Sequence, residues 1–310
     1  MAMVLQRLAR QLTTPSGEIL GVAVFLLVAA AAFPRLLSPY DPIQIQGTLS
    51  MRAPTWGHTL GTDLLGKDVL SQIIYGTRTT LLIGASAVLL SLVAGTLIGL
   101  VSGFWGGSML DETLMRLIDA LYIFPDLILA LTIVAILGPG RIESVIIALA
   151  IGHVAAYARL VRSRVLALRG AEFVAAARSL GASANRILVR HILPQTTDVL
   201  VVRSVIALSS VVLGEAALSF LGLGVQPPTP SWGRMLRDGF QYLATAPWVA
   251  FSPGFAIFLT VFLFNHVGEM IRDVLDPHAL MARTPSAAAR RPPNPTRPMG
   301  DATPVPTSKE

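Results

Sequence analysis

Long apolar runs recur along this chain, and they constrain its fold more than any other feature of the sequence. A helix of about 20 residues is long enough to cross the hydrocarbon core of a bilayer. No run alternates between polar and apolar residues, which disfavours a transmembrane β-barrel. We therefore predict an all-α membrane protein of about six transmembrane helices. The apolar runs lie near 17–37, 79–102, 114–137, 142–163, 198–221 and 248–269.

The composition agrees with a membrane protein. Hydrophobic residues make up 53% of the 310 residues and charged residues only 14%, whereas about a quarter of a soluble domain is charged. The alanines 29–32 could be taken for a signal-peptide cleavage site. The apolar run before them is longer than the core of a usual signal peptide, so we expect a retained first span.

The distribution of arginines predicts the orientation of the chain. Residues 158–195 contain seven arginines and Glu172 as their one acidic residue. Loops rich in Lys and Arg stay on the cytoplasmic side of a membrane. We therefore expect this loop and both termini to be cytoplasmic, with 38–78 and 222–247 on the outer side. The same argument assigns the basic charge to insertion and anionic lipid, not to nucleic acid.

Three regions follow from this topology. Residues 1–78 comprise an N-terminal cytoplasmic segment, the first transmembrane helix and an outer loop, and residues 79–278 form a five-helix core. Residues 279–310 are rich in Ala, Arg, Thr and Pro and have almost no large apolar residues. Such a tail cannot bury a core, and we expect it to be disordered in the cytoplasm.

Within the arginine-rich loop, residues 171–195 read as two short helices. Phe173, Ala176, Ala177 and Leu180 share one face of the first helix, at helical spacing. Gly181 suits the left-handed residue that ends a helix. Ser183 is a candidate N-cap for the second helix, which should stop or kink at Pro194. The apolar face needs a cover, which could be the protein's own bundle, the lipid headgroups or a partner protein.

This segment resembles the coupling loop of permease subunits of bacterial ABC importers. The Glu-Ala-Ala block of that loop corresponds to residues 175–177, its glycine to Gly181 and its hydrophobic-Leu-Pro ending to 192–194. Ala175 replaces the usual Glu, and Glu172 lies one helical turn earlier. The resemblance implies that the loop inserts into a cleft on an ATPase subunit. The implied coupling residues are Glu172, Phe173, Ala176, Ala177, Arg178, Leu180, Gly181, Ala182 and Pro194.

Two further segments are similar to the second (C-type) permease of dipeptide, oligopeptide and nickel importers. One is the outer loop 58–79, where Lys67 stands at a position more often occupied by Arg. The other runs from 213 to 224 and continues through Pro227-Pro228 to Ser231-Trp232-Gly233. The resemblance covers most of residues 1–278. The outer-loop signature comprises Gly61, Thr62, Asp63, Gly66, Lys67 and Asp68.

The resemblance implies the setting of the protein. It implies a bacterial inner-membrane permease that works with a second homologous permease as a heterodimer, two ATPase subunits and an external binding protein. The solute would be a peptide, a nickel chelate or another small molecule. ATP and Mg²⁺ would bind to the ATPase subunits, because this chain has no Gly-x-x-x-x-Gly-Lys-Ser/Thr phosphate loop.

Both segments also have local interpretations. Gly61 to Asp63 have the composition of a turn, and Asp68 to Tyr75 could form a short helix on the outer membrane surface. This loop either packs over the pore entrance or touches a binding protein. Trp232 and Trp248 are expected to act as anchors at the membrane–water boundary, where amphipathic rings are enriched.

Ionisable residues inside the spans are functional candidates, because charge in lipid is costly. Asp119 could form an ion pair with Arg116. Glu215, together with Ser219, either lines a translocation path or makes an interhelical hydrogen bond, and His153 is more simply a packed residue. The full set is Asp119, Asp126, His153, Glu215, His266 and Glu269.

Small residues recur every four positions at Gly95, Gly99 and Gly103, which predicts a close helix–helix contact. The chain has no cysteine and no recurring His and carboxylate spacing, so we predict no metal site. A transporter acting alone and a membrane-embedded enzyme remain alternatives. The coupling loop argues against the first, and the absence of a paired catalytic constellation argues against the second.

Overall fold

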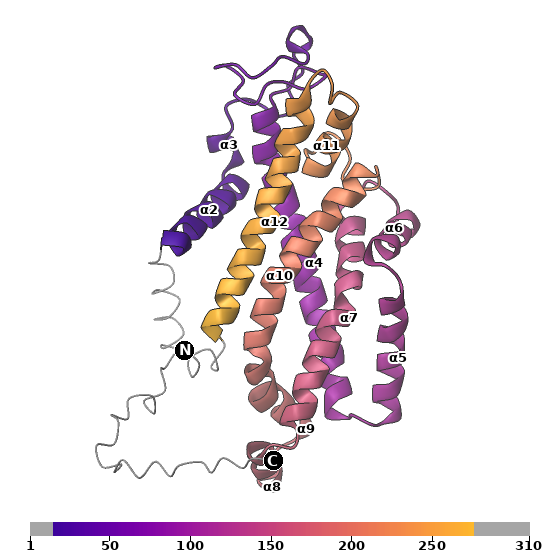
Figure 1. Ribbon diagram of the computed structural model, residues 1–310. Coiled ribbons are helices and arrows are strands. Elements are labelled where there is room, and N and C mark those ends of the chain that lie inside the picture. The colour runs from indigo at the N-terminus through magenta and orange to yellow at the C-terminus, as the bar shows by residue number, and fades with distance from the viewer. Residues whose placement is uncertain (1–14, 276–310) are drawn as a thin grey trace, which may run out of the picture. The chain divides into compact units, whose positions relative to one another are not determined.

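Long helices dominate the computed structural model, which describes residues 15–275 (Figure 1). Four helical stretches are long and apolar enough to cross a membrane, and a bent pair of helices would make a fifth. A shorter apolar helix, α2 (Pro15–Ala32), precedes them. The predicted all-helical fold is confirmed, and the predicted count of six is approximate. The four long helices are α4 (Val69–Phe104), α7 (Ile142–Leu168), α10 (Thr197–Phe220) and α12 (Pro247–Leu275).

The predicted glycine stripe brings α4 and α7 into close contact. Gly95, Gly99 and Gly103 all lie against α7. A Cβ atom added to Gly99 would lie only 2.5 Å from the carbonyl oxygen of Ala158, so only glycine permits this separation. The predicted helix contact is therefore confirmed, and it lies within the chain.

The third span is broken, which the sequence analysis did not predict. Helix α5 (Met109–Ile123) ends before Pro125, and α6 (Asp126–Leu137) leaves at 97° to it. Phe124 has an extended backbone, with φ −78° and ψ 135°. The ring of a proline disfavours the helical conformation of the preceding residue, which explains the position of the break.

The outer loop leads directly into α4, which corrects the expectation of a separate surface helix. Helix α4 begins at Val69 and continues for 36 residues. Asp68 is its N-cap, and the carboxylate accepts a hydrogen bond from the backbone N–H of Ser71. Because Ser71 to Tyr75 contain no helix-breaking residue, the helix propagates from this cap into the span.

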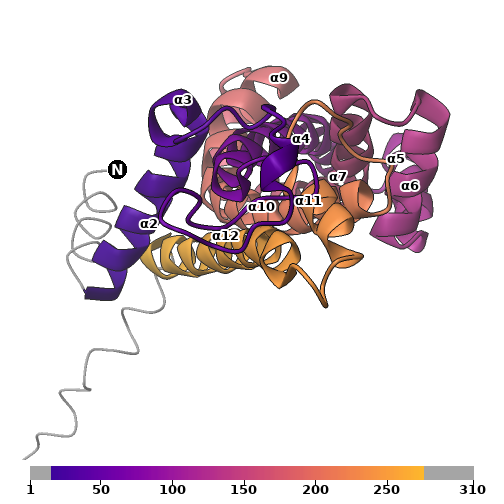
Figure 2. The ribbon, with the colours of Figure 1, turned by 90° about the horizontal axis from the view of Figure 1, so that it is seen from above.

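The remaining elements occupy the flanks and the two ends of the central helices. Seen along the bundle, α2 and α3 (Pro34–Leu37) lie on the flank opposite α5 and α6 (Figure 2). We call the end that carries the outer-loop signature and α11 (Trp232–Phe240) the signature end. The other end, with α8 (Glu172–Ser179) and α9 (Ala184–Ile187), is the arginine-rich end.

One hydrophobic core joins the central helices to the arginine-rich end. It includes residues of α4, α6, α7 and α10, together with Val174 and Ala177 of α8 and Ile187 of α9. The short helices of the loop are thus packed on the same core as the spans. The predicted disordered tail, 279–310, lies outside the described residues, and the limits of the three predicted regions stay predictions.

Candidate functional site

The two carboxylates of the outer-loop signature accept hydrogen bonds from the loop itself and from the first turn of α4. Asp63 accepts hydrogen bonds from the backbone N–H groups of Leu65, at 2.8 Å, and Lys67, at 2.9 Å, and from the side-chain amide of Gln72, at 2.9 Å. Asp68 accepts from the backbone and hydroxyl of Ser71 and lies 2.9 Å from Nδ1 of His58. These bonds stabilise one conformation of the loop, and they account for both acidic residues of the signature.

Thr62 and the two glycines of the signature hold the loop against its neighbours. Thr62 is fully buried; its hydroxyl donates to the carbonyl of Leu49, and its own carbonyl accepts from the indole N–H of Trp248. Gly66 has φ +74°, and a Cβ there would lie 1.9 Å from the carbonyl oxygen of Gln46. Gly61 has φ +73° and is equally enclosed. The signature therefore encodes a folded loop.

Trp232 is enclosed by the protein, so its ring is not free to anchor the chain in lipid as expected. It is buried, its indole N–H donates to the carbonyl of Ile73 at 3.0 Å, and its ring leaves room only for glycine at Gly76. The residue packs α11 against α4.

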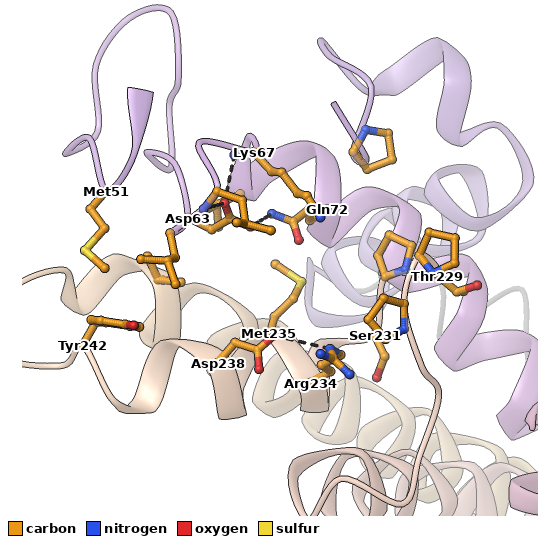
Figure 3. A pocket seen from close by; sticks show the side chains of 18 of the residues that line it. Met51, Asp63, Lys67, Gln72, Thr229, Ser231, Arg234, Met235, Asp238 and Tyr242 are labelled. Carbon is orange, nitrogen blue, oxygen red and sulfur yellow. Dashed lines mark hydrogen bonds and ion pairs between the residues drawn. The ribbon is translucent and has the colours of Figure 1, made fainter. Parts of the chain in front are cut away.

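A cavity of about 380 Å³ lies between the signature loop and α11 (Figure 3). Lys67 and Gln72 line one side, and Arg234 and Asp238 of α11 line the other. Arg234 is engaged, since it contacts Asp238 at 3.4 Å and donates to Gln226 at 2.9 Å. The Lys67 ammonium forms no hydrogen bond or ion pair with the residues described.

Glu215 and Ser219 meet at the junction of α10 and α11. Glu215 is 1% exposed, and its Oε1 accepts hydrogen bonds from the hydroxyls of Ser219, at 2.7 Å, and Ser231, at 2.8 Å. Ser219 is buried as well. Of the two roles left open by the sequence, this geometry favours the interhelical hydrogen bond over contact with a passing solute.

The two short helices of the arginine-rich end form close to where they were expected. Gly181 ends α8 with φ +77°. Ser183 occupies the N-cap position of α9, but its side chain makes no capping hydrogen bond. Pro194 does not end the helical path: the chain passes through a π turn and a 3₁₀ turn, residues 188–196, into α10. A proline cannot donate to the helical ladder, which accounts for the irregular turns.

Helix α8 has a packed side and a free side. Val174 and Ala177 are buried against the core, whereas Phe173 is 36% exposed and Leu180 is 88% exposed. Ala177 therefore does not belong to the exposed face on which the sequence analysis placed it. Ala176 does, and it lies beside Phe173 and Leu180. The helix presents large apolar side chains outward from a fixed position.

A buried ion pair next to this loop escaped the sequence analysis. Asp111, in the first turn of α5, is 2% exposed and accepts two hydrogen bonds of 2.7 Å from the guanidinium of Arg162 in α7. It also accepts from the hydroxyl of Ser102 and from the backbone N–H of Gly107. An arginine within an apolar span was the signal that could have revealed it.

A second ion pair corrects one expectation. Asp119 does not pair with Arg116; its carboxylate lies 2.7 Å from the guanidinium of Arg159 in α7. Arg178 of α8 lies over the ring of Phe104, at 5.5 Å from the centroid. Helices α4, α5, α7 and α8 are thus joined by charged side chains at the arginine-rich end.

The sequence comparisons identify the family. The profile of the family described as "Binding-protein-dependent transport system inner membrane component" matches residues 95–280. The chain belongs to this family. It is 39% identical over 271 residues to the dipeptide transport system permease protein DppC of Alkalihalophilus pseudofirmus, covering 86% of this chain and 88% of that protein. It is 42% identical over 258 residues to the glutathione transport system permease protein GsiD of Pectobacterium atrosepticum, covering 83% and 85%.

A solved structure supports the fold of this transport component. It is described as inward-facing conformations of the MetNI methionine ABC transporter, with a TM-score of 0.54, 21% identity, and coverage of 66% of this chain and 96% of that chain. The family membership makes the chain a multi-pass membrane subunit of a transport system and not an enzyme. Among residues 15–275 no group of His, Asp and Glu side chains could hold a metal ion.

Proposed function

We propose that this permease forms half of the translocation path of an ABC importer for peptides or a related small solute. It would couple ATP hydrolysis by partner subunits to alternating access across the bacterial inner membrane. The relatives named for dipeptide and glutathione transport support the solute class. A nickel chelate or another small solute remains the alternative, and a transport assay with each decides between them.

The observation that carries this proposal is the exposed face of α8. Large apolar side chains at the surface of a soluble segment mark contact sites. Phe173 and Leu180 are exposed, while the opposite side of α8 is held by Val174 and Ala177 in the core of the bundle. A partner that displaces α8 would therefore displace the ends of the spans, which is what energy coupling requires.

The charge of the arginine-rich end supports its cytoplasmic location, where ATPase subunits reside. Seven arginines lie between residues 158 and 195, and positively charged loops are retained in the cytoplasm. We place both termini on the same side. The signature end then faces outward, where an external binding protein delivers solute.

The partners follow from the size and chemistry of the chain. The four or five full spans and one short apolar helix found within residues 15–275 are too few to enclose a peptide-sized path, so a second homologous permease completes it as a heterodimer. ATP and Mg²⁺ bind to two partner ATPase subunits, since this sequence has no phosphate-binding loop.

Replacing both Phe173 and Leu180 with Asp tests the coupling assignment. Removal of a buried interface side chain can cost about 2 kcal/mol or more. The double variant should insert in the membrane, lose its ATPase subunits on purification and fail to import peptide. Ser179→Asp is the matched control, because Ser179 is exposed on a different side of α8. Import at the wild-type rate by the double variant contradicts the assignment.

A further inference from the structure

The outer loop displays a tryptophan at the tip of a turn. Trp56 is fully exposed, and Ile45, Leu64 and Leu65 of the same loop are exposed as well. The backbone N–H of Gln46 donates to the carbonyl of Leu65 at 3.1 Å, which brings the segments that carry Ile45 and Leu65 together. A single exposed apolar side chain is ordinary, whereas several on one loop mark a contact site.

Hydrogen bonds hold this turn in one place. Backbone bonds of 2.9 and 3.1 Å between Thr55 and His58 enclose Trp56 and Gly57. The hydroxyl of Tyr40 donates to the carbonyl of Gly57 at 2.8 Å, and its ring centroid lies 4.7 Å from that of His58. His58 also lies 2.9 Å from the carboxylate that caps α4. A side chain carried on such a fixed turn can bind a partner with little loss of backbone entropy.

Helix α4 measures how far the turn lies from the bilayer. Arg78 is exposed on α4, and the apolar run 79–102 that follows it is about 36 Å long, enough to fill a core of about 30 Å. Asp68, which holds the turn through His58, is ten residues before Arg78, or about 15 Å along the axis. A tilt of 40° would still leave about 11 Å.

This distance places the turn in water. The headgroup layer on each side of a bilayer is only about 5–8 Å thick. The loop between α3 and α4 extends beyond the end of α4 (Figure 1). Lipid therefore does not cover Trp56, and the observations favour a protein as its partner.

The charges left free on the signature end define the chemistry of that partner. Every aspartate in 38–68 and 222–247 accepts a hydrogen bond or an ion pair; these are Asp41, Asp63, Asp68 and Asp238. The side chains of Arg52, Lys67 and Arg237 make no hydrogen bond or ion pair with residues 15–275. A protein that covers this end needs an acidic surface, because like charges across an interface repel each other.

We propose that Trp56 is the anchor on which the external binding protein docks, with Arg52 and Lys67 guiding an acidic face of that protein. The family is described as binding-protein-dependent, and we assign the signature end to the side where a binding protein resides. The indole would enter a hollow of the partner, as tryptophans at interface hot spots do. This inference rests on the proposed function and adds the residues that receive the binding protein.

The affinity of the binding protein tests the anchor. The assembled importer is placed in nanodiscs, and the probe is the binding protein that stimulates its ATP hydrolysis. Trp56→Ala should weaken binding by about thirtyfold, as expected of a hot spot, mainly through faster dissociation. Trp56→Phe should recover part of the loss. Leu36→Ala, which removes an exposed apolar side chain of α3, is the control and should bind like the wild type.

The exposure of Trp56 separates binding from folding. Because its ring is fully exposed, Trp56→Ala should unfold at the wild-type temperature. A loss of affinity then reflects a lost contact with the partner. Wild-type affinity in Trp56→Ala overturns the proposal.

Association rates test the acidic face. Charges at the rim of an interface act mainly on the association rate and its salt dependence. Association with the wild type should slow as salt is raised. Arg52→Gln and Lys67→Gln should associate more slowly and depend less on salt, whereas Arg164→Gln, an exposed charge of the arginine-rich end, should change neither. Association that is independent of salt overturns the assignment of an acidic partner.

A spin label distinguishes a protein partner from lipid. The chain contains no cysteine, so Trp56→Cys gives it one labelling site. The label should be reached by a water-soluble relaxation agent and should lose mobility when the binding protein is added. A label that only lipid-soluble oxygen reaches, or that stays mobile at saturating binding protein, overturns the proposal.

The wild-type complex shows which conclusion fails. ATP hydrolysis that responds to no binding protein refutes the proposed function. A normal response of the wild type, together with unchanged affinity in Trp56→Ala, refutes this inference alone.

Discussion

The contact between α4 and α7 yields a prediction in which the same substitution has opposite effects at two positions of one helix. Gly84 and Gly99 both lie inside α4. Replacing a glycine in a helix by alanine favours the helix by about 0.8–1 kcal/mol. At Gly84 the added Cβ would lie 3.5 Å from a flexible Leu208 methyl group, which is an ordinary contact. Gly84→Ala should therefore stabilise the protein.

At Gly99 the same methyl group has no room. It would lie 2.5 Å from the carbonyl oxygen of Ala158, 2.7 Å from Cβ of Val161 and 3.0 Å from the backbone nitrogen of Arg162. Backbone atoms cannot rotate away, so α7 must move by on the order of 1 Å to reach a normal contact distance. A gap of about 0.5–1 Å already forfeits a quarter to a half of each van der Waals contact, and overpacking costs about 1–3 kcal/mol.

Thermal unfolding of the purified complex in detergent measures the difference. A change of 1 kcal/mol shifts the midpoint by about 2–4 °C in a protein of this size class. Gly84→Ala should raise the midpoint and Gly99→Ala should lower it. Equal shifts of the same sign for both variants would show that the glycine stripe is not the close contact described here.

Three further outcomes are expected. Asp111→Asn should destabilise the protein by about 2–3 kcal/mol, since its pair with Arg162 is largely buried. Asp119→Asn breaks an exposed pair and should cost only about 0–1 kcal/mol. Thermal unfolding that ranks the two variants in the reverse order contradicts the assigned burial. A cysteine at Thr229 should be labelled from outside intact cells and one at Ser179 should not; external labelling at Ser179 reverses the proposed orientation. If Glu172 replaces the acidic residue missing from the coupling block, Glu172→Ala should weaken transport-stimulated ATP hydrolysis while the complex stays assembled. Unchanged stimulation shows that the apolar face of α8 is sufficient for coupling.

Hydropathy and local chemistry were sufficient for the fold class and for the approximate positions of the two short helices at the arginine-rich end. Apolar runs of bilayer length specify spanning helices because the backbone has no hydrogen-bond partner in lipid except itself. Gly181 could be recognised as the residue that ends α8, since few other residues adopt its φ of +77°. The spacing of Gly95, Gly99 and Gly103 predicted a close contact, because residues four apart share one helix face.

Partners that are distant in the sequence were decided only by the tertiary structure. The break before Pro125 could be anticipated from proline chemistry, but its angle of 97° depends on the packing of α6 against α7. Asp119 had Arg116 within reach on its own helix, yet it pairs with Arg159 of α7. Trp232 was expected to be a membrane anchor because of its amphipathic ring, but it is buried against α4.

The physical reason is that local sequence determines which backbone conformation is favourable and which face of a helix is apolar. It does not determine which other helix meets that face. The hydrogen bond from the hydroxyl of Tyr157 in α7 to that of Ser204 in α10 forms because these two helices pack together. Sequence alone showed that Glu215 is costly in a membrane, and only the packed structure supplied the hydroxyl of Ser231 as a hydrogen-bond partner.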